Sequence, residues 1–135
     1  MAEITGRCLC GEISFSGDAD IKMMANCHCW DCRGATGTAY GTLIFGDSSE
    51  LTVRGAPKVF KHKADSVADI EKHFCPNCGS QLFGGNSNRP TMMSLRAGMV
   101  DQTNLVKPTA TVYMESRFAS TPIDPALKAF DKMPG

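Results

Sequence analysis

The arrangement of seven cysteines constrains this chain of 135 residues more than any other feature of its sequence. Three cysteines lie close together in Cys27-His28-Cys29-Trp30-Asp31-Cys32, and the other four form two tight pairs, Cys8-Leu9-Cys10 and Cys75-Pro76-Asn77-Cys78. Thiolates at such spacings are common ligands of zinc, which prefers four ligands in a tetrahedron. An odd number of cysteines also fits a division into four plus three better than complete pairing in disulfides. We therefore expect two metal sites of different kinds.

The two pairs are expected to form a closed, structural zinc site. Cys75 and Cys78 can reach one ion through a single tight turn, a zinc knuckle that the proline between them and the glycine after them favour. Cys8 and Cys10 would supply the other two ligands from the bent end of a strand. The ion would then hold the N-terminal strand against the middle of the chain. The alternatives are four ordinary reduced cysteines of the core or a disulfide between the pairs.

The remaining cysteines, Cys27, Cys29 and Cys32, can face one ion and leave its fourth position to water or substrate, as in catalytic zinc sites. Three thiolates leave a bound Zn²⁺ site with net negative charge. Such a site suits capture of a thiol or thiol adduct better than formation of a strong hydroxide. Two alternatives stay open: His28, His73 or another residue closes the site and makes it structural, or Cys29 forms a redox pair with Cys32 or Cys27.

Two residues beside this cluster could bind a substrate. Trp30 is the only tryptophan and could line a pocket at the open position, or it could pack in the core. Arg33 could bind a substrate carboxylate, or it could be an exposed surface arginine. His28 lies between two expected ligands, so its ring should point away from the metal. We expect it either to pack beside the ligands without binding the metal or to lie at the surface. We also expect His73 on the surface.

The sequence favours a mainly β fold in a single domain, residues 1–135. Glycine and proline punctuate many short segments, and apolar residues with helical periodicity are almost absent. Short helical segments are expected at 31–37 and 126–132, and a polar loop at 84–90. Alternating and apolar patterns predict strands at 12–16, 21–27, 40–45, 51–54, 58–62, 68–74, 81–83, 91–95 and 112–115.

Charge and hydropathy argue against several kinds of partner. The formal net charge is zero and no run of lysine or arginine occurs, so neither nucleic acid nor an anionic membrane surface is expected to bind. No apolar run approaches the ~20 residues that span a bilayer, and the first residues lack the apolar core of a signal peptide. We therefore expect a cytoplasmic protein whose cysteines stay reduced. The sequence leaves a homodimer open.

Several of these motifs resemble the glutathione-dependent formaldehyde-activating enzyme family, also called the centromere protein V domain family. The resemblance covers about residues 5–118, and Thr111 stands where members often carry a histidine. It implies a β-tent domain of packed antiparallel sheets, with the two pairs on a structural zinc and the three-cysteine cluster on a catalytic zinc. The matching motifs are Gly6-Arg7-Cys8-Leu9-Cys10-Gly11, residues 27–37, Phe74-Cys75-Pro76-Asn77-Cys78-Gly79-Ser80 and Leu95-Arg96-Ala97-Gly98-Met99-Val100-Asp101.

The resemblance also implies carbon–sulfur lyase chemistry, in which glutathione and formaldehyde are interconverted with S-hydroxymethylglutathione. The leading hypothesis is therefore a zinc-dependent carbon–sulfur lyase that acts on a small thiol–aldehyde adduct, with Cys27, Cys29 and Cys32 as its catalytic centre. The alternative is a non-catalytic binding module stabilised by zinc. The second site could also be only partly occupied, because three accessible thiolates can lose metal or oxidise.

Overall fold

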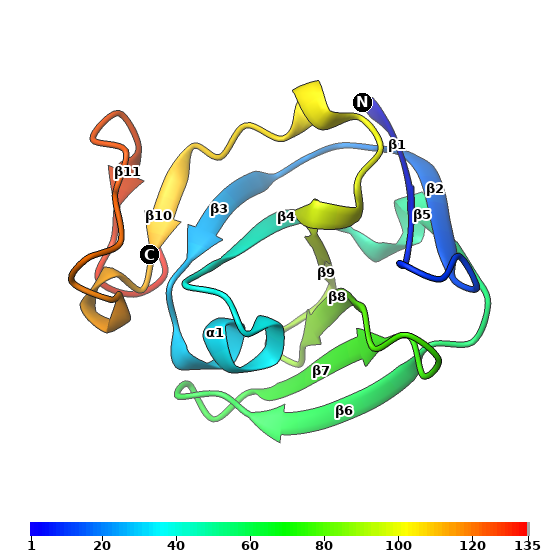
Figure 1. Cartoon of the computed structure of the whole chain (residues 1–135), viewed down its shortest axis with the longest axis horizontal. Helices are drawn as coiled ribbons and strands as arrows, with labels where there is room; N and C mark the ends of the chain where they lie inside the picture. Colours follow the sequence, from blue (N-terminus) through cyan, green and yellow to red (C-terminus); the bar gives the residue numbers. More distant parts are fainter. Residues whose placement is uncertain (135) are drawn as a thin grey trace.

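A computed structural model of the chain describes residues 1–134, and Figure 1 shows its strands and helices in chain order. Four short 3₁₀ helices accompany one α-helix in this part of the chain: η1 (Ser48–Glu50), η2 (Ala97–Met99), η3 (Thr103–Leu105), η4 (Met114–Ser116) and α1 (Trp30–Thr36). The strands are β1 (Ala2–Arg7), β2 (Ser14–Ala19), β3 (Met23–Cys27), β4 (Gly41–Asp47), β5 (Leu51–Arg54), β6 (Lys58–Lys63), β7 (Asp69–Phe74), β8 (Gln81–Asn86), β9 (Arg89–Arg96), β10 (Ala110–Val112) and β11 (Lys128–Ala129).

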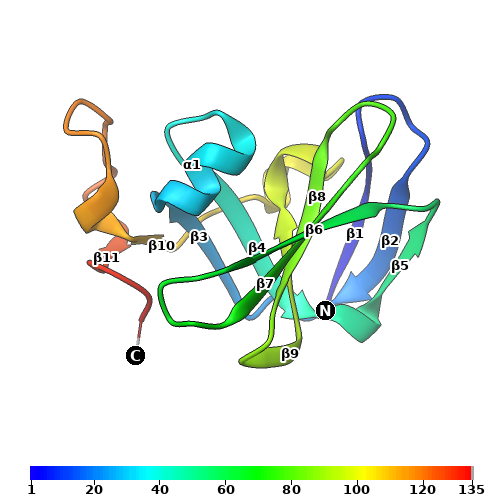
Figure 2. The same ribbon diagram turned by 90° about the horizontal axis from the view of Figure 1, so that it is seen from below.

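The strands form two sheets, so the prediction of a mainly β fold of packed sheets is confirmed. The smaller sheet has the order β1-β2-β5, and the larger has the order β11-β10-β3-β4-β9-β8-β7-β6. Pairing is antiparallel except at β10, which runs parallel to both β3 and β11. Figures 1 and 2 both show the smaller sheet at one end of the molecule and α1 beside the larger sheet. None of the helices among residues 1–134 is long and apolar enough to cross a membrane.

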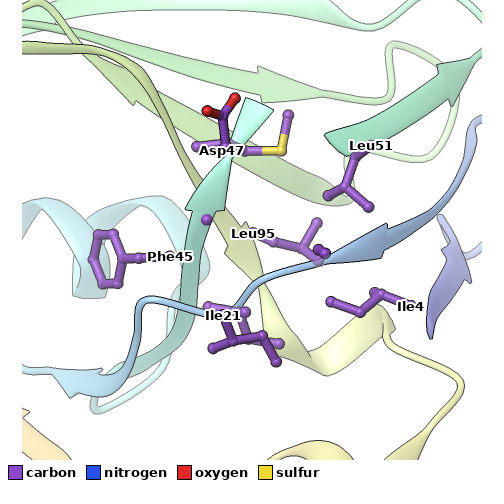
Figure 3. A pocket seen from close by; sticks show the side chains of 10 residues that line it. Ile4, Ile21, Phe45, Asp47, Leu51 and Leu95 are labelled. Atoms are coloured by element: carbon purple, nitrogen blue, oxygen red, sulfur yellow. The ribbon is translucent and has the colours of Figure 1, made fainter. Parts of the chain in front are cut away.

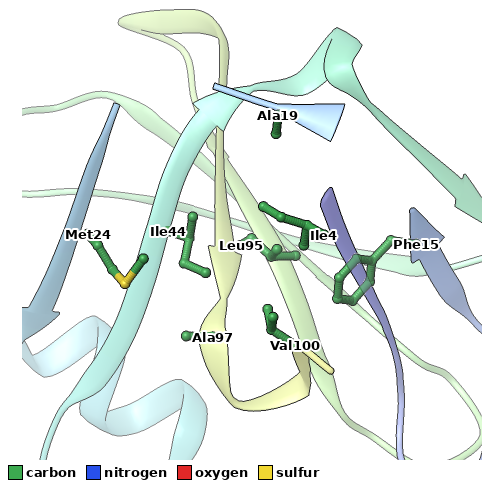
Figure 4. Close-up of a cluster of buried hydrophobic side chains, with 8 residues drawn as sticks. All are labelled: Ile4, Phe15, Ala19, Met24, Ile44, Leu95, Ala97 and Val100. Carbon is green, nitrogen blue, oxygen red and sulfur yellow. The ribbon is translucent and has the colours of Figure 1, made fainter. Parts of the chain in front are cut away.

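The main hydrophobic core lies between the two sheets. Figure 4 shows Ile4 and Phe15 of the smaller sheet pointing toward Ile44 and Leu95 on β4 and β9 of the larger one. A small space remains at the edge of this core, lined by Ile4, Leu51 and Leu95 among others (Figure 3). Its volume of about 10 Å³ holds at most one water molecule. This space is therefore a packing gap and not a ligand site.

Several elements agree with the sequence patterns. The strand at Leu51–Arg54 has its predicted bounds, and 58–62 and 68–74 form a hairpin as β6 and β7. The short helical segment predicted at 31–37 is α1, which ends at Gly37 with φ of 72°. Glycine is suited to this left-handed position because it has no Cβ.

Three predictions near turns were wrong. The expected loop at 84–90 is mostly strand, because β8 continues through Gly84 and Gly85, where no side chains reveal the pattern. The strand expected at 112–115 ends at Val112, where Tyr113 adopts φ of 56° and η4 follows. The helix expected at 126–132 is a turn followed by β11. The Asp124 side chain does accept from the Ala126 N–H, but the following backbone pairs with β10.

The core between the sheets should respond strongly to truncation of Leu95. Leu95→Ala is expected to lower the free energy of unfolding by about 2–5 kcal/mol, because the side chain is buried between both sheets. Leu9→Ala makes the same change at a side chain that is 82% exposed, and should cost less than about 0.5 kcal/mol. Denaturant titration measures both, and equal losses would contradict this description of the core.

Candidate metal sites and the adjoining cavity

Four cysteines far apart in the chain come together where β1 ends and the turn between β7 and β8 begins. The sulfurs of Cys8, Cys10, Cys75 and Cys78 all lie within 4.8 Å of one another. The Cys8–Cys10 and Cys10–Cys75 Sγ distances are 3.6 and 3.7 Å. A tetrahedral site with metal–sulfur bonds of ~2.3 Å has sulfurs ~3.8 Å apart. This group, which we call the quartet, therefore has the geometry to hold a metal ion.

Local backbone geometry explains how the quartet forms. In the knuckle, the Gly79 N–H donates to the Cys75 carbonyl at 2.8 Å, and Gly79 has φ of 78°. The Ser80 hydroxyl lies 3.2 Å from Cys78 Sγ, and their hydrogen bond is the main cause that lowers the pKa of Cys78 to about 5. Cys75 and Cys8 are fully buried. The knuckle therefore places Cys75 and Cys78 side by side, and Cys78 loses its proton more readily than a free thiol.

The other three cysteines form a second group, which we call the trio. Cys27 ends β3, Cys29 is the N-cap of α1 and Cys32 lies in the first turn of α1. Their sulfurs lie within 4.8 Å of one another, and Cys27 and Cys29 Sγ are 3.4 Å apart. Within the described residues, no fourth cysteine, histidine or carboxylate joins them at this spacing. The trio can therefore hold a metal ion and has no protein ligand for a fourth position.

Hydrogen bonds divide the protons of the trio unequally. The Cys27 and Cys32 thiols donate toward Cys29 and lower its pKa to about 2, whereas sharing a proton with Cys29 raises the pKa of Cys27. The Cys32 N–H also donates to Cys29 Sγ at 3.3 Å. Metal binding would displace the protons that remain on the trio.

A cavity of about 460 Å³ opens beside the trio, within the size range of small-molecule sites. The sulfurs line it together with α1, with the β6–β7 turn, and with strands β4, β7, β8 and β9 of the larger sheet, which we call its floor. By contrast, the quartet does not line this space. The two sulfur groups therefore differ in access as well as in number.

The structure places Trp30 and Arg33 differently. Trp30 lines the cavity and is 68% exposed, so it does not pack in the core. The Arg33 guanidinium lies 4.4 Å from the Phe118 ring centroid and 5.6 Å from that of Trp30. Its Nε donates to the His28 carbonyl at 3.3 Å, and Arg33 is not part of the cavity wall. The expected role of Arg33 in binding a substrate carboxylate stays a prediction.

His28 was placed near the ligands or at the surface, and the surface assignment was wrong. The side chain is 1% exposed, and its Nε2 lies 3.0 Å from Thr111 Oγ1. Its ring packs against Tyr40 with centroids 4.9 Å apart, and Nδ1 has no hydrogen-bond partner among the described residues. His28 therefore braces α1 against β10 and stays outside the trio. His73 also stays outside it, half-buried on Phe83.

Two residues of the cavity floor were missed. Lys72 and Arg96 are buried, 7% and 9% exposed, and both line the cavity. Each lies on or beside a segment predicted to be a strand, where a lysine or arginine is normally expected to face solvent. Only the pairing of the strands reveals that these side chains share a face with the trio.

The fold and its two sulfur groups define a mainly β protein with two cysteine clusters that could hold metal ions. The family model for the glutathione-dependent formaldehyde-activating enzyme matches residues 3–116, so the chain belongs to this family, as its motifs indicated. A protein of Halomonas elongata named as such an enzyme is 28% identical over 82% of this chain and 73% of its own length. An uncharacterised lyase of Schizosaccharomyces pombe is 30% identical over 65% of this chain and 61% of its own length.

A solved structure supports the fold. A crystal structure of a protein from Rhodobacter sphaeroides has a TM-score of 0.57 to this chain, covering 77% of it and 96% of the other. The two are 18% identical, so this likeness concerns the fold alone.

The His28–Thr111 contact generates a stability prediction. Thr111→Val should lower the free energy of unfolding by about 1–3 kcal/mol, because it keeps the side-chain shape but leaves the buried His28 ring without its polar partner. Thr91→Val, at an exposed position of β9, makes the same change as a control. Thermal and denaturant unfolding measure both variants. A Thr111→Val protein as stable as the Thr91→Val control would show that this hydrogen bond does not brace α1.

Proposed function

We propose that this protein is a zinc-dependent carbon–sulfur lyase that acts on a small thiol–aldehyde adduct similar to S-hydroxymethylglutathione. The observation that carries the proposal is the trio, three sulfurs without a fourth protein ligand in the described chain, on the wall of a ligand-sized cavity. Membership of the family and the names of the two relatives support the same class of reaction. A binding module without activity has no observation in its favour beyond the quartet.

The two sulfur groups are proposed to hold zinc in different roles. Cys8, Cys10, Cys75 and Cys78 would hold a structural ion, and Cys27, Cys29 and Cys32 a catalytic one. Soft thiolates suit zinc, and the quartet spacing matches its tetrahedral geometry. When bound at the trio, zinc would supply a Lewis acid that polarises the sulfur or hydroxyl oxygen of the adduct.

The proposed reaction is balanced without a redox partner. In the cleavage direction the carbon–sulfur bond breaks and its electron pair stays on sulfur. The hydroxyl oxygen loses its proton and forms the carbonyl of formaldehyde, and the sulfur leaves as a thiol once it is protonated. In the other direction the thiol adds to formaldehyde. The cavity would hold the thiol and formaldehyde together beside Cys27, Cys29 and Cys32. The reaction would then occur between two bound molecules and would not depend on a chance encounter in solution. Trp30, which lines the cavity, and Arg33, which lies beside Trp30 outside the cavity wall, are proposed substrate contacts.

The metal assignment predicts different results for serine variants of the two groups. The wild type should contain two zinc ions per chain, and Cys29→Ser one, with the fold retained and turnover reduced more than about 100-fold. Even partners of metal ligands cost ~10–100-fold when removed, so a ligand should cost more. Zinc is measured by elemental analysis, and turnover by NMR exchange between S-hydroxymethylglutathione and formaldehyde.

Cys10→Ser is the matched control, since it changes an exposed ligand of the quartet. It should lower the melting temperature more than Cys29→Ser does, because the quartet joins the two sheets. Full turnover by Cys29→Ser would rule out the proposed catalytic centre.

A further inference from the structure

We propose that Lys72 and Arg96 form an anion-binding subsite on the cavity floor that receives a carboxylate of the thiol substrate. This subsite would make the protein selective for thiols that carry an acid group. The inference deepens the function proposed above and rests on it. It assigns substrate selectivity to two buried cations that line the cavity. Arg33, by contrast, does not line the cavity.

Strand pairing places the two cations on one face of the larger sheet. Lys72 on β7 is opposite Gly84 on β8, and Gly84 is opposite Ser94 on β9. Arg96 follows Ser94 by two residues, so its side chain leaves the sheet on the same face. A Cβ at Gly84 would lie 2.9 Å from Ser94 Oγ and 3.4 Å from Arg96 Nη2. The glycine therefore leaves the room that these side chains occupy beneath the cavity.

Neither cation has a carboxylate partner among residues 1–134. Lys72 Nζ lies 2.6 Å from His62 Nε2, and Arg96 Nη1 donates to the carbonyl and hydroxyl oxygens of Ser94, each at 3.1 Å. Every salt bridge between a lysine and a carboxylate in this part of the chain lies at the exposed surface instead. Burying two positive charges without a directly bonded carboxylate costs free energy, which a bound anion would recover.

Titration behaviour agrees with this placement. Burial lowers the pKa of Lys72 and the positive charge of Arg96 lowers it further, against the attraction of Asp31 and two trio sulfurs. Burial also lowers the pKa of Arg96, against the attraction of the trio sulfurs. Both effects are those expected of cations held away from water, and an anion between them would oppose both.

No carboxylate around the cavity pairs directly with the two cations in the described chain. Asp31 on α1 is half-buried and attracts Lys72 without forming a salt bridge, and Asp65 in the β6–β7 turn is exposed. Arg89 is also exposed. A zinc ion on three thiolates would carry a net charge of −1, against +2 from Lys72 and Arg96.

A pair of small thiols isolates the role of the carboxylate. Thioglycolate and 2-mercaptoethanol are similar in size, but only the first carries a negative charge beside its thiol. The zinc-loaded wild type should bind thioglycolate about 10- to 100-fold more tightly, as expected for hydrogen bonds to charged groups. Isothermal titration calorimetry measures both affinities without requiring turnover. The rate of formaldehyde transfer to each thiol is measured separately.

The variant Lys72→Met keeps the length of the side chain and removes its charge. It should reduce thioglycolate affinity about 10-fold or more and leave 2-mercaptoethanol affinity and zinc content unchanged. Lys61→Met removes the same charge from an exposed position of β6 and should alter none of these. Arg96→Lys keeps the charge but loses the planar fork, so it should bind thioglycolate with intermediate affinity. Lys72→Gln replaces Lys72→Met if circular dichroism shows that the latter is unfolded.

The outcomes separate this inference from the lyase proposal. Equal loss of affinity for both thiols, or loss of zinc in Lys72→Met, would overturn the subsite and make the two cations counter-ions of the trio. Turnover of both thiol adducts without preference for the acid would leave the lyase standing and the subsite refuted. Selective thioglycolate binding without turnover of either adduct would support the subsite and refute the lyase.

Discussion

The meeting of Cys8 and Cys10 with Cys75 and Cys78 is the constraint on which the arrangement of the molecule depends. It joins segments 65 residues apart at Cys10 and Cys75, one in the turn between β1 and β2 of the smaller sheet and the other in the turn between β7 and β8 of the larger. The buried side of the quartet packs with Ile13 and Leu82 in a separate hydrophobic cluster. Sulfur geometry and apolar burial therefore act at the same place. A metal in the quartet would add a link that a small sheet of three strands cannot supply alone.

The trio has the same chemistry but different surroundings. Its sulfurs are presented by the end of β3 and the first turn of α1, and His28 fixes that helix to β10 through Thr111. A cavity lies on the open side, with Lys72 and Arg96 beneath it. In the quartet every ligand position is filled from within the protein, whereas in the trio one direction faces space for a ligand. This difference in access supports assigning structure to one group and catalysis to the other.

The sequence predicted the sulfur groups better than it predicted the cavity. Cysteine spacing is a local signal, so Cys75 and Cys78, or Cys27 and Cys29, could be grouped without knowledge of the fold. Strand 51–54 and the β6–β7 hairpin were likewise visible in the residue pattern. The prediction ended β8 too early, because Gly84 and Gly85 have no side chains and so give no alternation of polar and apolar residues.

Other features depend on contacts between distant segments. The capping interaction of Asp124 forms as its sequence indicates, yet pairing of β11 with β10 prevents a helix. His28 is buried because Thr111 and Tyr40 surround it, and both lie outside its own motif. Lys72 and Arg96 lie on the same face of the larger sheet because of the register of β7, β8 and β9. The residues near each of them in the sequence do not indicate this register.

X-ray absorption at the zinc edge tests the central claim, an unequal division of seven cysteine sulfurs between two ions. The account predicts sulfur ligands with one lighter ligand at one of the ions, no imidazole scattering, and replacement of the lighter ligand by an eighth sulfur when a thiol substrate is added. Imidazole at either ion, or a sulfur signal that a saturating thiol leaves unchanged, would contradict it.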